Sequence, residues 1–318
     1  MKKILLLSDE FDYAKMITHD AGPGYAGKMG WTCTFLEKRS HYLDHVNLID
    51  SRITERECEI LEDHIATHQE TLFVPKIVDP GGYYREHWFY RFLFRIKDRE
   101  NVYYLSTYPP TDLVKELDDA TGNRKMVFIP FPFQDSYTID PALSPRHKQV
   151  IFSGARHPHI YPERQAFLDG VRHNPLLWGK VHHLKHPGYP DNGQRQRHAI
   201  VGERYMNYLS QFRWMFVSPS RYGLELLKYS ECAYARCVPV GQVPHSFSAR
   251  LQESFISLDF DHLGQSLRRV FSMPLTELQE IARAYYQAMA EERHPDRLNA
   301  HLDDFLAGVH TEIPALCL

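Results

Sequence analysis

The 318-residue sequence has little cysteine, little net charge and no long apolar run. Its five cysteines are scattered and odd in number, which argues against a disulfide framework and favours the reducing cytoplasm. No apolar stretch approaches the roughly 20 residues of a membrane-spanning helix, so we expect a cytoplasmic protein, free or peripheral at a membrane. A formal net charge of −3 gives no global attraction to nucleic acid or anionic lipid, so any polyanion contact must be local.

Repeats of fixed period and low-complexity segments are also missing, and 43% hydrophobic residues is an ordinary globular composition. Ser8, Asp9 and Glu10 interrupt the N-terminal run KKILLLS before it reaches the length of a signal-peptide core. The run therefore predicts a first strand.

Short β-rich runs alternate with segments of helical periodicity along the chain, which predicts an α/β fold of parallel sheets joined by helical crossovers. Strands are predicted over residues 2–8, 45–50, 71–77, 101–107 and 125–133, and again over 149–154, 179–185, 213–218, 237–243 and 254–259. Helices are predicted over 54–68, with Thr54 as the N-cap, and over 83–100, 161–173, 202–212 and 223–236.

The Pro-containing segment 130–145 carries turn signals and separates the two runs of strands. We therefore predict two Rossmann-like domains, over residues 1–146 and 147–318. The last helical segments, 274–293 and 295–309, have no strand between them. They cannot form another βαβ unit, so we expect them to brace the two domains.

The exit of the strand RWMFVSPS and the helix after it carry the residues with the clearest chemistry. In open α/β sheets, ligands bind beyond the carboxyl ends of the strands. Gly223 would let a phosphate approach the backbone at the start of that helix. Glu225, Lys228 and Glu231 are spaced three apart, which suits hydrogen bonds to a ribose diol from Glu231 and a diphosphate contact from Lys228. The same spacing also fits a solvent-exposed face with ordinary salt bridges.

The stretch SPSRYGLELLKYSECAYARCVPV resembles the donor-binding motif of the GT-B glycosyltransferases, and its K-x-x-E followed by CVPV is most similar to exostosin-like and spore-coat-type members. VIFSGA with YPER, and YMNYLSQFRWMFVSPS, resemble the elements that precede this motif in the family. The resemblance covers about 149–243. It departs from the common pattern, because Glu225 and Glu231 are six apart and Gly223 stands eight before Glu231, where the family often has a first glutamate.

The resemblance implies two Rossmann-like domains facing across a cleft, an N-terminal acceptor domain and a C-terminal domain that binds a nucleotide-sugar, UDP- or GDP-linked. It also implies a transfer reaction that needs no obligatory cofactor or metal. The implied donor-binding residues are Arg156, Lys185, Tyr222, Gly223, Glu225, Lys228 and Glu231. For Arg156 and Lys185, a solvated surface cation is the alternative interpretation.

An acceptor-side group is expected in the segment that follows the first strand. Gly22 and Gly24, with Gly27, resemble the glycine-rich acceptor loop of many GT-B enzymes. His19 or Asp20 just before them is the candidate catalytic base, which would remove a proton from an acceptor hydroxyl. A purely structural turn remains the alternative.

The nineteen histidines raise the question of a metal site. HPH and HHLKH place several of them at strand spacing, but no cysteine or nearby acid completes a familiar ligand set, so we predict no metal site. The triplet Asp259-Phe260-Asp261 is interpreted as a strand end. Lys185, Arg195 and Arg197 in the segment 182–198 form the best local case for contact with an anionic acceptor.

The sequence thus predicts transfer of a sugar from a nucleotide-sugar to a hydroxyl acceptor: a glycan, a lipid-linked glycan, a small molecule or a modified nucleic-acid base. A nucleic-acid acceptor is not favoured. An epimerase or phosphorylase on the same fold and a non-catalytic nucleotide-sugar-binding module are the rival hypotheses. The oligomeric state and the stereochemistry of transfer are left open.

Overall fold

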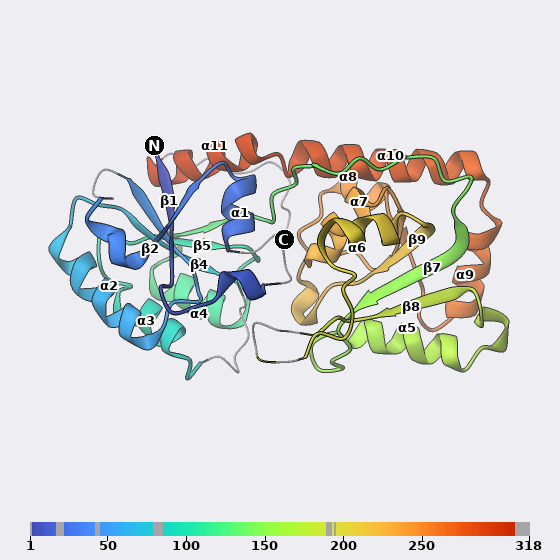
Figure 1. Cartoon of the computed structure of the whole chain (residues 1–318), viewed down its shortest axis with the longest axis horizontal. Helices are drawn as coiled ribbons and strands as arrows, with labels where there is room; N and C mark the ends of the chain where they lie inside the picture. Colours follow the sequence, from blue (N-terminus) through green and yellow to red (C-terminus); the bar gives the residue numbers. More distant parts are fainter. Residues whose placement is uncertain are drawn as a thin grey trace. The chain divides into compact units, whose positions relative to one another are not determined.

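The computed structural model describes residues 2–16, 22–41, 45–78, 85–188, 193 and 195–308. The chain divides into two units. Among the described residues, unit 1 comprises those of 2–132 and 293–308, and unit 2 comprises those of 133–292. Both are α/β units, in which helices cover the faces of a parallel sheet (Figure 1). The two predicted runs of alternating strands and helices are therefore confirmed as two Rossmann-like domains.

Unit 1 contains a six-stranded sheet in the order β2-β1-β3-β4-β5-β6. Its strands are β1 (Lys3–Leu7), β2 (Thr32–Phe35), β3 (Val46–Ile49), β4 (Phe73–Ile77), β5 (Tyr104–Ser106) and β6 (Met126–Phe128). Its helices are α1 (Pro23–Lys28), α2 (Glu55–Thr67), α3 (Trp88–Arg95), α4 (Asp112–Ala120) and α11 (Pro295–Leu306). All the pairings between neighbouring strands are parallel.

Unit 2 contains a five-stranded parallel sheet in the order β11-β10-β9-β7-β8. Its strands are β7 (His147–Gly154), β8 (Val181–Lys185), β9 (Phe212–Val217), β10 (Val238–Gly241) and β11 (Ile256–Ser257). Its helices are α5 (Pro162–Arg172), α6 (Gly202–Leu209), α7 (Leu227–Tyr234), α8 (Ala249–Glu253), α9 (Leu263–Ser272) and α10 (Leu275–Glu292). Both units have the same winding, since the second strand lies on one side of the first and the third strand on the other.

Alternating side chains of the unit 2 strands build a core on each face of the sheet. Val150 and Phe152 of β7 pack with residues of α5 and α9, while Ile151 between them packs with residues of α6 and α7. The strands are apolar throughout because both faces are covered, as expected of a parallel sheet.

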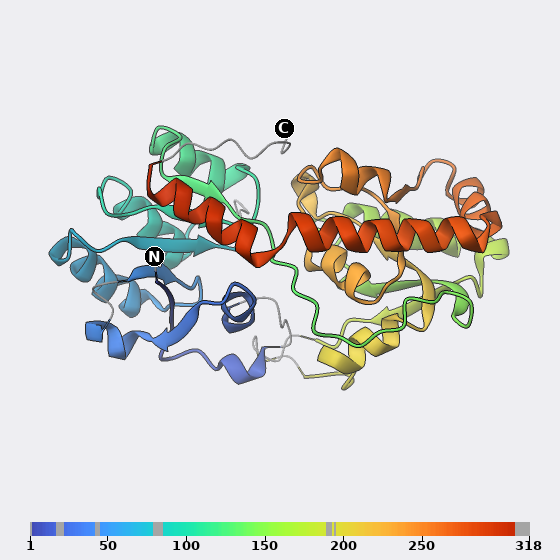
Figure 2. The same cartoon turned by 90° about the horizontal axis from the view of Figure 1, so that it is seen from above.

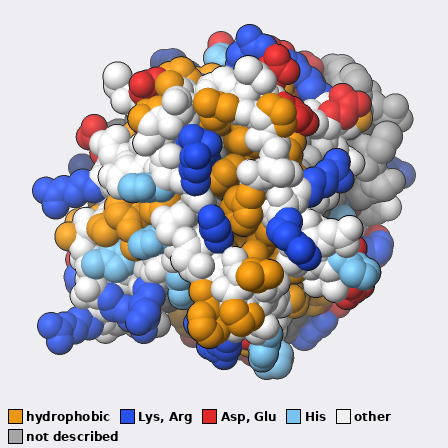
Figure 3. Space-filling view, turned by 90° about the vertical axis from the view of Figure 1, so that its right-hand side faces the viewer, with side chains coloured by type: hydrophobic (Ala, Val, Ile, Leu, Met, Phe, Trp, Pro, Cys, Tyr) orange, Lys and Arg blue, Asp and Glu red, His pale blue; other side chains and the backbone are white. Residues whose placement is uncertain are grey.

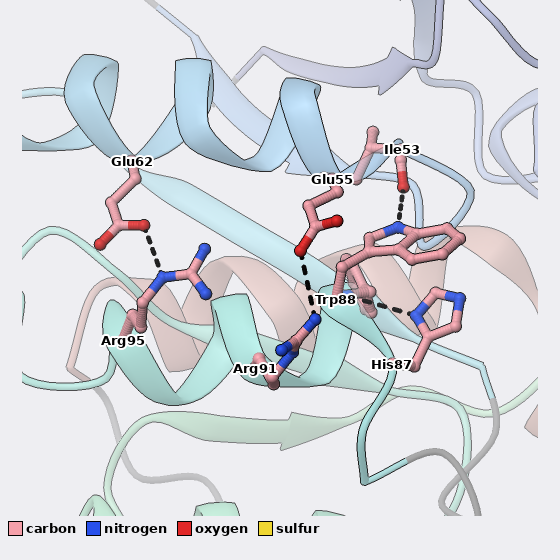
Figure 4. A network of polar contacts seen from close by, with 8 residues as sticks. Ile53, Glu55, Glu62, His87, Trp88, Arg91 and Arg95 are labelled. Atoms are coloured by element: carbon pink, nitrogen blue, oxygen red, sulfur yellow. Dashed lines mark hydrogen bonds and ion pairs between the residues drawn. The ribbon is translucent and has the colours of Figure 1, made fainter.

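Helix α2 begins as its sequence predicts. The Thr54 side chain accepts a hydrogen bond from the N–H of Glu57, whose carboxylate accepts one from the N–H of Thr54, so both ends of a capping box are present. Polar contacts tie α2 to α3 on the surface (Figure 4). They include the ion pairs of Arg91 with Glu55 and of Arg95 with Glu62.

The segment before β7 belongs to unit 2 from Phe133 onward, whereas the sequence placed the boundary at residue 147. The Phe133 ring stacks on Tyr234 with centroids 4.3 Å apart, and the N–H of Gln134 donates to the Tyr234 hydroxyl. Leu143 is fully buried in the unit 2 core. These side chains attach the Pro-containing segment to unit 2, which a turn-and-breaker pattern alone does not reveal.

The two final helices belong to different units. Tyr285 of α10 donates a hydrogen bond to the carbonyl of Tyr229 within unit 2. Helix α11 packs on unit 1, where Asp303 pairs with Lys3 at 2.8 Å and Asn299 accepts from the Trp31 indole. Figure 2 shows the long α10 and the shorter α11. Within the described parts of the chain, none of the helices combines the length and apolarity needed to span a membrane.

The predicted glycine-rich loop is wrong for Gly24 and Gly27, because both lie inside helix α1. Tyr25 and Ala26 of this helix are completely buried, and burial of these side chains outweighs the low helix propensity of the glycines. Gly22 precedes the helix at φ +52°, a left-handed conformation that suits glycine. Strand β2, which the sequence did not predict, follows α1 at the edge of the sheet.

Candidate functional site

The candidate site of unit 2 lies at the carboxyl ends of β7 and β9, where the winding of the sheet reverses direction. This is the position at which open α/β sheets bind ligands. β7 ends at Gly154, whose φ of +116° only glycine adopts without strain. A Cβ atom added there would lie 2.9 Å from Arg164 Nη1 and 3.2 Å from Lys228 Cε. The missing side chain therefore lets two cations approach the strand end.

Four side chains form one hydrogen-bonded network at this edge. Lys228 Nζ lies 2.5 Å from Glu231 Oε2 and 3.0 Å from the hydroxyl of Tyr205 on α6. Tyr205 donates its proton to the same Glu231 oxygen at 3.1 Å, so Ser153 of β7, 2.5 Å away, donates in turn to Tyr205. Burial, and then the Glu231 carboxylate, raise the pKa of Tyr205, which therefore stays neutral. The network fixes Lys228 and Glu231 relative to the strand end.

Arg164 supplies a second, more deeply placed cation. Its side chain is 4% exposed, its guanidinium lies 4.0 Å from the centroid of the Tyr161 ring, and Nη1 donates to the Ala155 carbonyl. Burial lowers the pKa of Arg164, while the charge of Glu231 raises it. Arginine remains charged under such conditions, so a permanent positive charge stands behind Gly154.

A cavity of about 970 Å³ opens beside this strand end. The described residues that line it are Gly154, Ala155, Arg156, His157, His183, Lys185, His186, Gly188, Arg195, Gln196 and Arg197. None of these is acidic. The predicted cations Arg156 and Lys185 thus lie in one cavity with Arg195 and Arg197, and such a cavity favours an anionic ligand.

His186 connects the cavity to the network. Burial, and then the positive charges of Lys228 and Arg164, lower its pKa to about 4. The N–H of Gly188 donates to His186 Nδ1 at 3.0 Å. This bond requires a lone pair on Nδ1, so the geometry and the lowered pKa both describe a neutral imidazole at neutral pH.

The turn before α7 differs from the sequence prediction. The helix begins at Leu227 and not at Gly223, because Tyr222 and Gly223 both adopt positive φ angles, +64° and +67°. Leu224 and Leu226 are extended. His245, which follows β10, packs on this turn, and a Cβ added to Gly223 would lie 2.4 Å from its ring. The N–H of His245 also donates to the Gly223 carbonyl.

Glu225 does not share a helix face with Lys228 and Glu231. It precedes α7, is 2% exposed, and accepts a hydrogen bond from Ser246 Oγ at 2.7 Å. The predicted face of three side chains is therefore wrong for Glu225 and correct for the other two. Glu225 ties the turn before α7 to the segment that carries His245.

The predicted unit 1 residues are only partly described. His19 and Asp20 lie outside the described residues. Gly22 faces Asp50, because a Cβ added to Gly22 would lie 3.1 Å from Asp50 Oδ2. Asp50 follows β3, is 1% exposed, and pairs with Arg52 at 3.3 Å.

Within residues 2–16, 22–41, 45–78, 85–188, 193 and 195–308, no group of three His, Cys, Asp or Glu side chains is placed to hold a metal ion. Asp259 instead accepts hydrogen bonds from the backbone N–H groups of Asp261 and His262, directly before α9. The triplet at 259–261 thus forms a turn that leads into a helix.

Sequence reasoning missed Ser153, Arg164, Tyr205, His186 and His245 as site residues. Ser153 and Arg164 stand in segments that carry the family resemblance, so their position near a strand exit was the available signal. Tyr205 and His245 come from a separate helix and loop. Only the packing of these elements on β7 and α7 brings them to the site.

Two Rossmann-like domains of this winding are the GT-B fold. No protein-family model and no curated protein matches the chain.

Several solved structures are similar to the whole chain. An alpha,alpha-trehalose-phosphate synthase (UDP-forming) from Burkholderia vietnamiensis has a TM-score of 0.56 at 12% identity, covering 98% of this chain and 99% of that one. A trehalose 6-phosphate synthase from Burkholderia multivorans has a TM-score of 0.53 at 13% identity, covering 97% and 96%. The N-terminal domain of a Candida albicans trehalose-6-phosphate phosphatase has a TM-score of 0.56 at 8% identity, covering 96% and 97%. At these identities, the likeness shows the fold alone.

Proposed function

We propose that this chain is a glycosyltransferase whose nucleotide-sugar donor binds at the strand exits of unit 2. The observation that carries the proposal is the contact between Lys228 and Glu231 beside a cavity lined by cations. A UDP-forming synthase among the structures of similar fold supports the same reaction class. The cytoplasm, inferred from the scattered cysteines, is part of the proposal.

Each residue has a distinct role in this proposal. Glu231 accepts hydrogen bonds from the ribose hydroxyls of a UDP- or GDP-sugar. Lys228 and Arg156 neutralise the diphosphate. Tyr205 and Arg164 are positioning residues, because they contact the network or the strand end and hold it in place. Lys185 and Gly223 remain proposed donor contacts.

In the reaction, the acceptor oxygen forms a bond to the anomeric carbon as the bond from that carbon to the diphosphate oxygen breaks. The acceptor proton passes to a base, for which His19 or Asp20 is proposed. The nucleoside diphosphate leaves with the bonding electron pair, and the cations of unit 2 stabilise its charge without an obligatory metal.

Ligand binding tests the proposal first. Thermal unfolding of the full chain is followed with UDP, GDP, CMP, ADP and dTDP. A nucleoside diphosphate at 100 times its Kd should stabilise the folded state by about 2.7 kcal/mol, which corresponds to a rise in Tm of about 4 °C for a chain of 318 residues. No rise with any of the five contradicts the proposal.

Replacement of Glu231 tests the role of the site. Glu231→Ala should lower the release of nucleoside diphosphate from UDP- or GDP-sugars at least tenfold, because the ribose loses its carboxylate partner. Glu203→Ala, in the exposed first turn of α6, is the matched control and should retain full activity. Equal activities in the two variants would reject the assignment. Recovery of an isomerised nucleotide-sugar in place of free diphosphate would identify an epimerase.

A further inference from the structure

Two large apolar side chains protrude from unit 2 just before β8, whose other end carries Lys185 of the candidate site. Leu176 and Trp178 are 74% and 65% exposed, while Leu177 between them is 2% exposed. They lie on the short 3-10 turn η4 (Pro175–Leu177) between α5 and β8. The Asn174 side chain caps this turn by accepting from the N–H of Leu176. The buried Leu177 side chain therefore anchors the turn, and the side chains of Leu176 and Trp178 stay exposed on either side of it.

Exposed cations stand on the segments next to this pair. Trp178 Nε1 donates to the carbonyl of Arg172, and Lys180 follows two residues later. Lys148 is exposed near the start of β7. Two residues later, the N–H of Val150 donates to the carbonyl of Lys180. Arg268 bonds to the carbonyl of Gly264, which lies against Asn174.

Two of these cations, Arg172 and Lys180, stand in a segment without acidic residues. The sequence from residue 170 to residue 190 contains no Asp or Glu. The chain as a whole carries a formal charge of −3, so the positive charge is local. Figure 3 views the end of unit 2 near α9, and on it Lys and Arg side chains stand among hydrophobic ones, with the acidic side chains toward the rim.

This surface is separate from the donor site. Trp178 precedes β8 and Lys185 ends it, so the protruding turn and the cavity lie at opposite ends of one strand. A partner bound at the turn would leave the strand exits accessible. The exposed turn is therefore not part of the donor site.

We propose that the tip formed by Leu176 and Trp178, with Arg172, Lys180, Lys148 and Arg268, binds an anionic membrane surface. An indole is stable at the level of the lipid headgroups, and Leu176 buries its aliphatic side chain beside it. The cations pair with anionic headgroups. The charge complementarity favours anionic lipid over a neutral surface. An aliphatic side chain at the most exposed position favours lipid over nucleic acid, which requires stacking groups.

Vesicle sedimentation of the full chain tests this proposal and does not depend on the proposed reaction. Wild-type protein should sediment with vesicles of equimolar phosphatidylcholine and phosphatidylglycerol, far less with phosphatidylcholine alone, and less as salt is raised. Trp178→Ala should weaken vesicle binding about tenfold, because the apolar area that the indole buries in the membrane is lost. Lys180→Ala should weaken it about fivefold.

Matched controls come from unit 1. Phe35→Ala removes an aromatic ring that is 44% exposed, and Arg56→Ala removes an exposed cation of α2, and both should bind as wild type does. Brominated lipids should quench the fluorescence of wild-type protein and of Phe35→Ala, and quench Trp178→Ala much less. Absence of vesicle binding, or equal binding by Trp178→Ala, overturns the proposal. Retention on single-stranded DNA without vesicle binding overturns it in favour of a nucleic-acid surface.

Discussion

Lys228 Nζ and Glu231 Oε2 lie 2.5 Å apart on one face of α7, with side chains 19% and 17% exposed. At less than a fifth exposed, the two charges are only partly screened by solvent, and removal of one partner would leave the other poorly solvated. The network with Tyr205 and Ser153 orients both groups at the strand end. Such a pair can exchange its internal contact for a ligand that offers hydroxyls to Glu231 and negative charge to Lys228, as expected of a binding site.

Lys228→Ala should weaken donor binding. The variant should lose about 1–3 kcal/mol of unfolding free energy, because the mostly buried Glu231 carboxylate loses a partner, and it should bind a nucleoside diphosphate about tenfold more weakly or worse, because a point charge on the diphosphate is lost. The matched control is Lys115→Ala, which breaks the exposed ion pair of Lys115 with Asp119 in unit 1. Urea unfolding and calorimetric titration measure the two quantities. Equal affinities in both variants would remove Lys228 from the site.

Tyr205→Phe should loosen the network without removing a charge. The variant loses the bonds of the hydroxyl to Ser153, Glu231 and Lys228, at a cost of about 1–3 kcal/mol because Ser153 loses its acceptor. Donor affinity should fall with it. Tyr208→Phe on the same helix breaks one bond to His182 and is the control, for which donor affinity should not change. A fall in affinity in both variants would indicate a general defect of α6.

The sequence predicted most strands because apolar runs buried on both faces leave a clear pattern. This pattern did not reveal β2, because its residues are partly exposed at the sheet edge and lack an apolar run. Gly24 suggested a loop because local propensity was considered without the burial of Tyr25. The start of α7 was misplaced because the left-handed Tyr222 is not readable from residue type.

The candidate site was predictable only where it is local in sequence. Lys228 and Glu231 share a helix turn, so their spacing predicted their contact. Arg156 and Lys185 each follow or end a strand, so the edge of a parallel sheet predicted their common cavity. Tyr205 and His245 reach the site through the packing of whole elements, which no spacing reveals.

His186 should make folding sensitive to mild acid. Its pKa is about 4 in the folded chain, below the usual value of about 6.5. Between these values the unfolded chain binds more protons, so stability is full above about pH 6.5 and falls as the pH is lowered toward 4. Solvent screening limits the loss to about 2 kcal/mol. Urea unfolding of His186→Gln from pH 7 to pH 4.5 should show a shallower fall than wild type or the exposed control His147→Gln.

Gly223→Ala should cost more than its backbone conformation alone explains. Gly179 is the control, because its φ of +74° resembles the +67° of Gly223, but a Cβ there would meet nothing within 4 Å. Gly179→Ala should therefore cost about 1 kcal/mol, the strain of a left-handed alanine. At Gly223 the added Cβ would lie 2.4 Å from the His245 ring, which must shift or open the turn before α7.

The two contributions at Gly223 can be separated by a second substitution. The double variant Gly223→Ala/His245→Gly has no clash but keeps the backbone strain. Its unfolding free energy should therefore be lower than that of His245→Gly only by the cost measured for Gly179→Ala. Chemical denaturation of the four variants measures the coupling between residues 223 and 245. Additive losses would mean that His245 rotates away freely. A coupling free energy of about 1 kcal/mol or more would mean that the His245 ring is held in place against the turn before α7. Gly223, which has no side chain, leaves space for that ring.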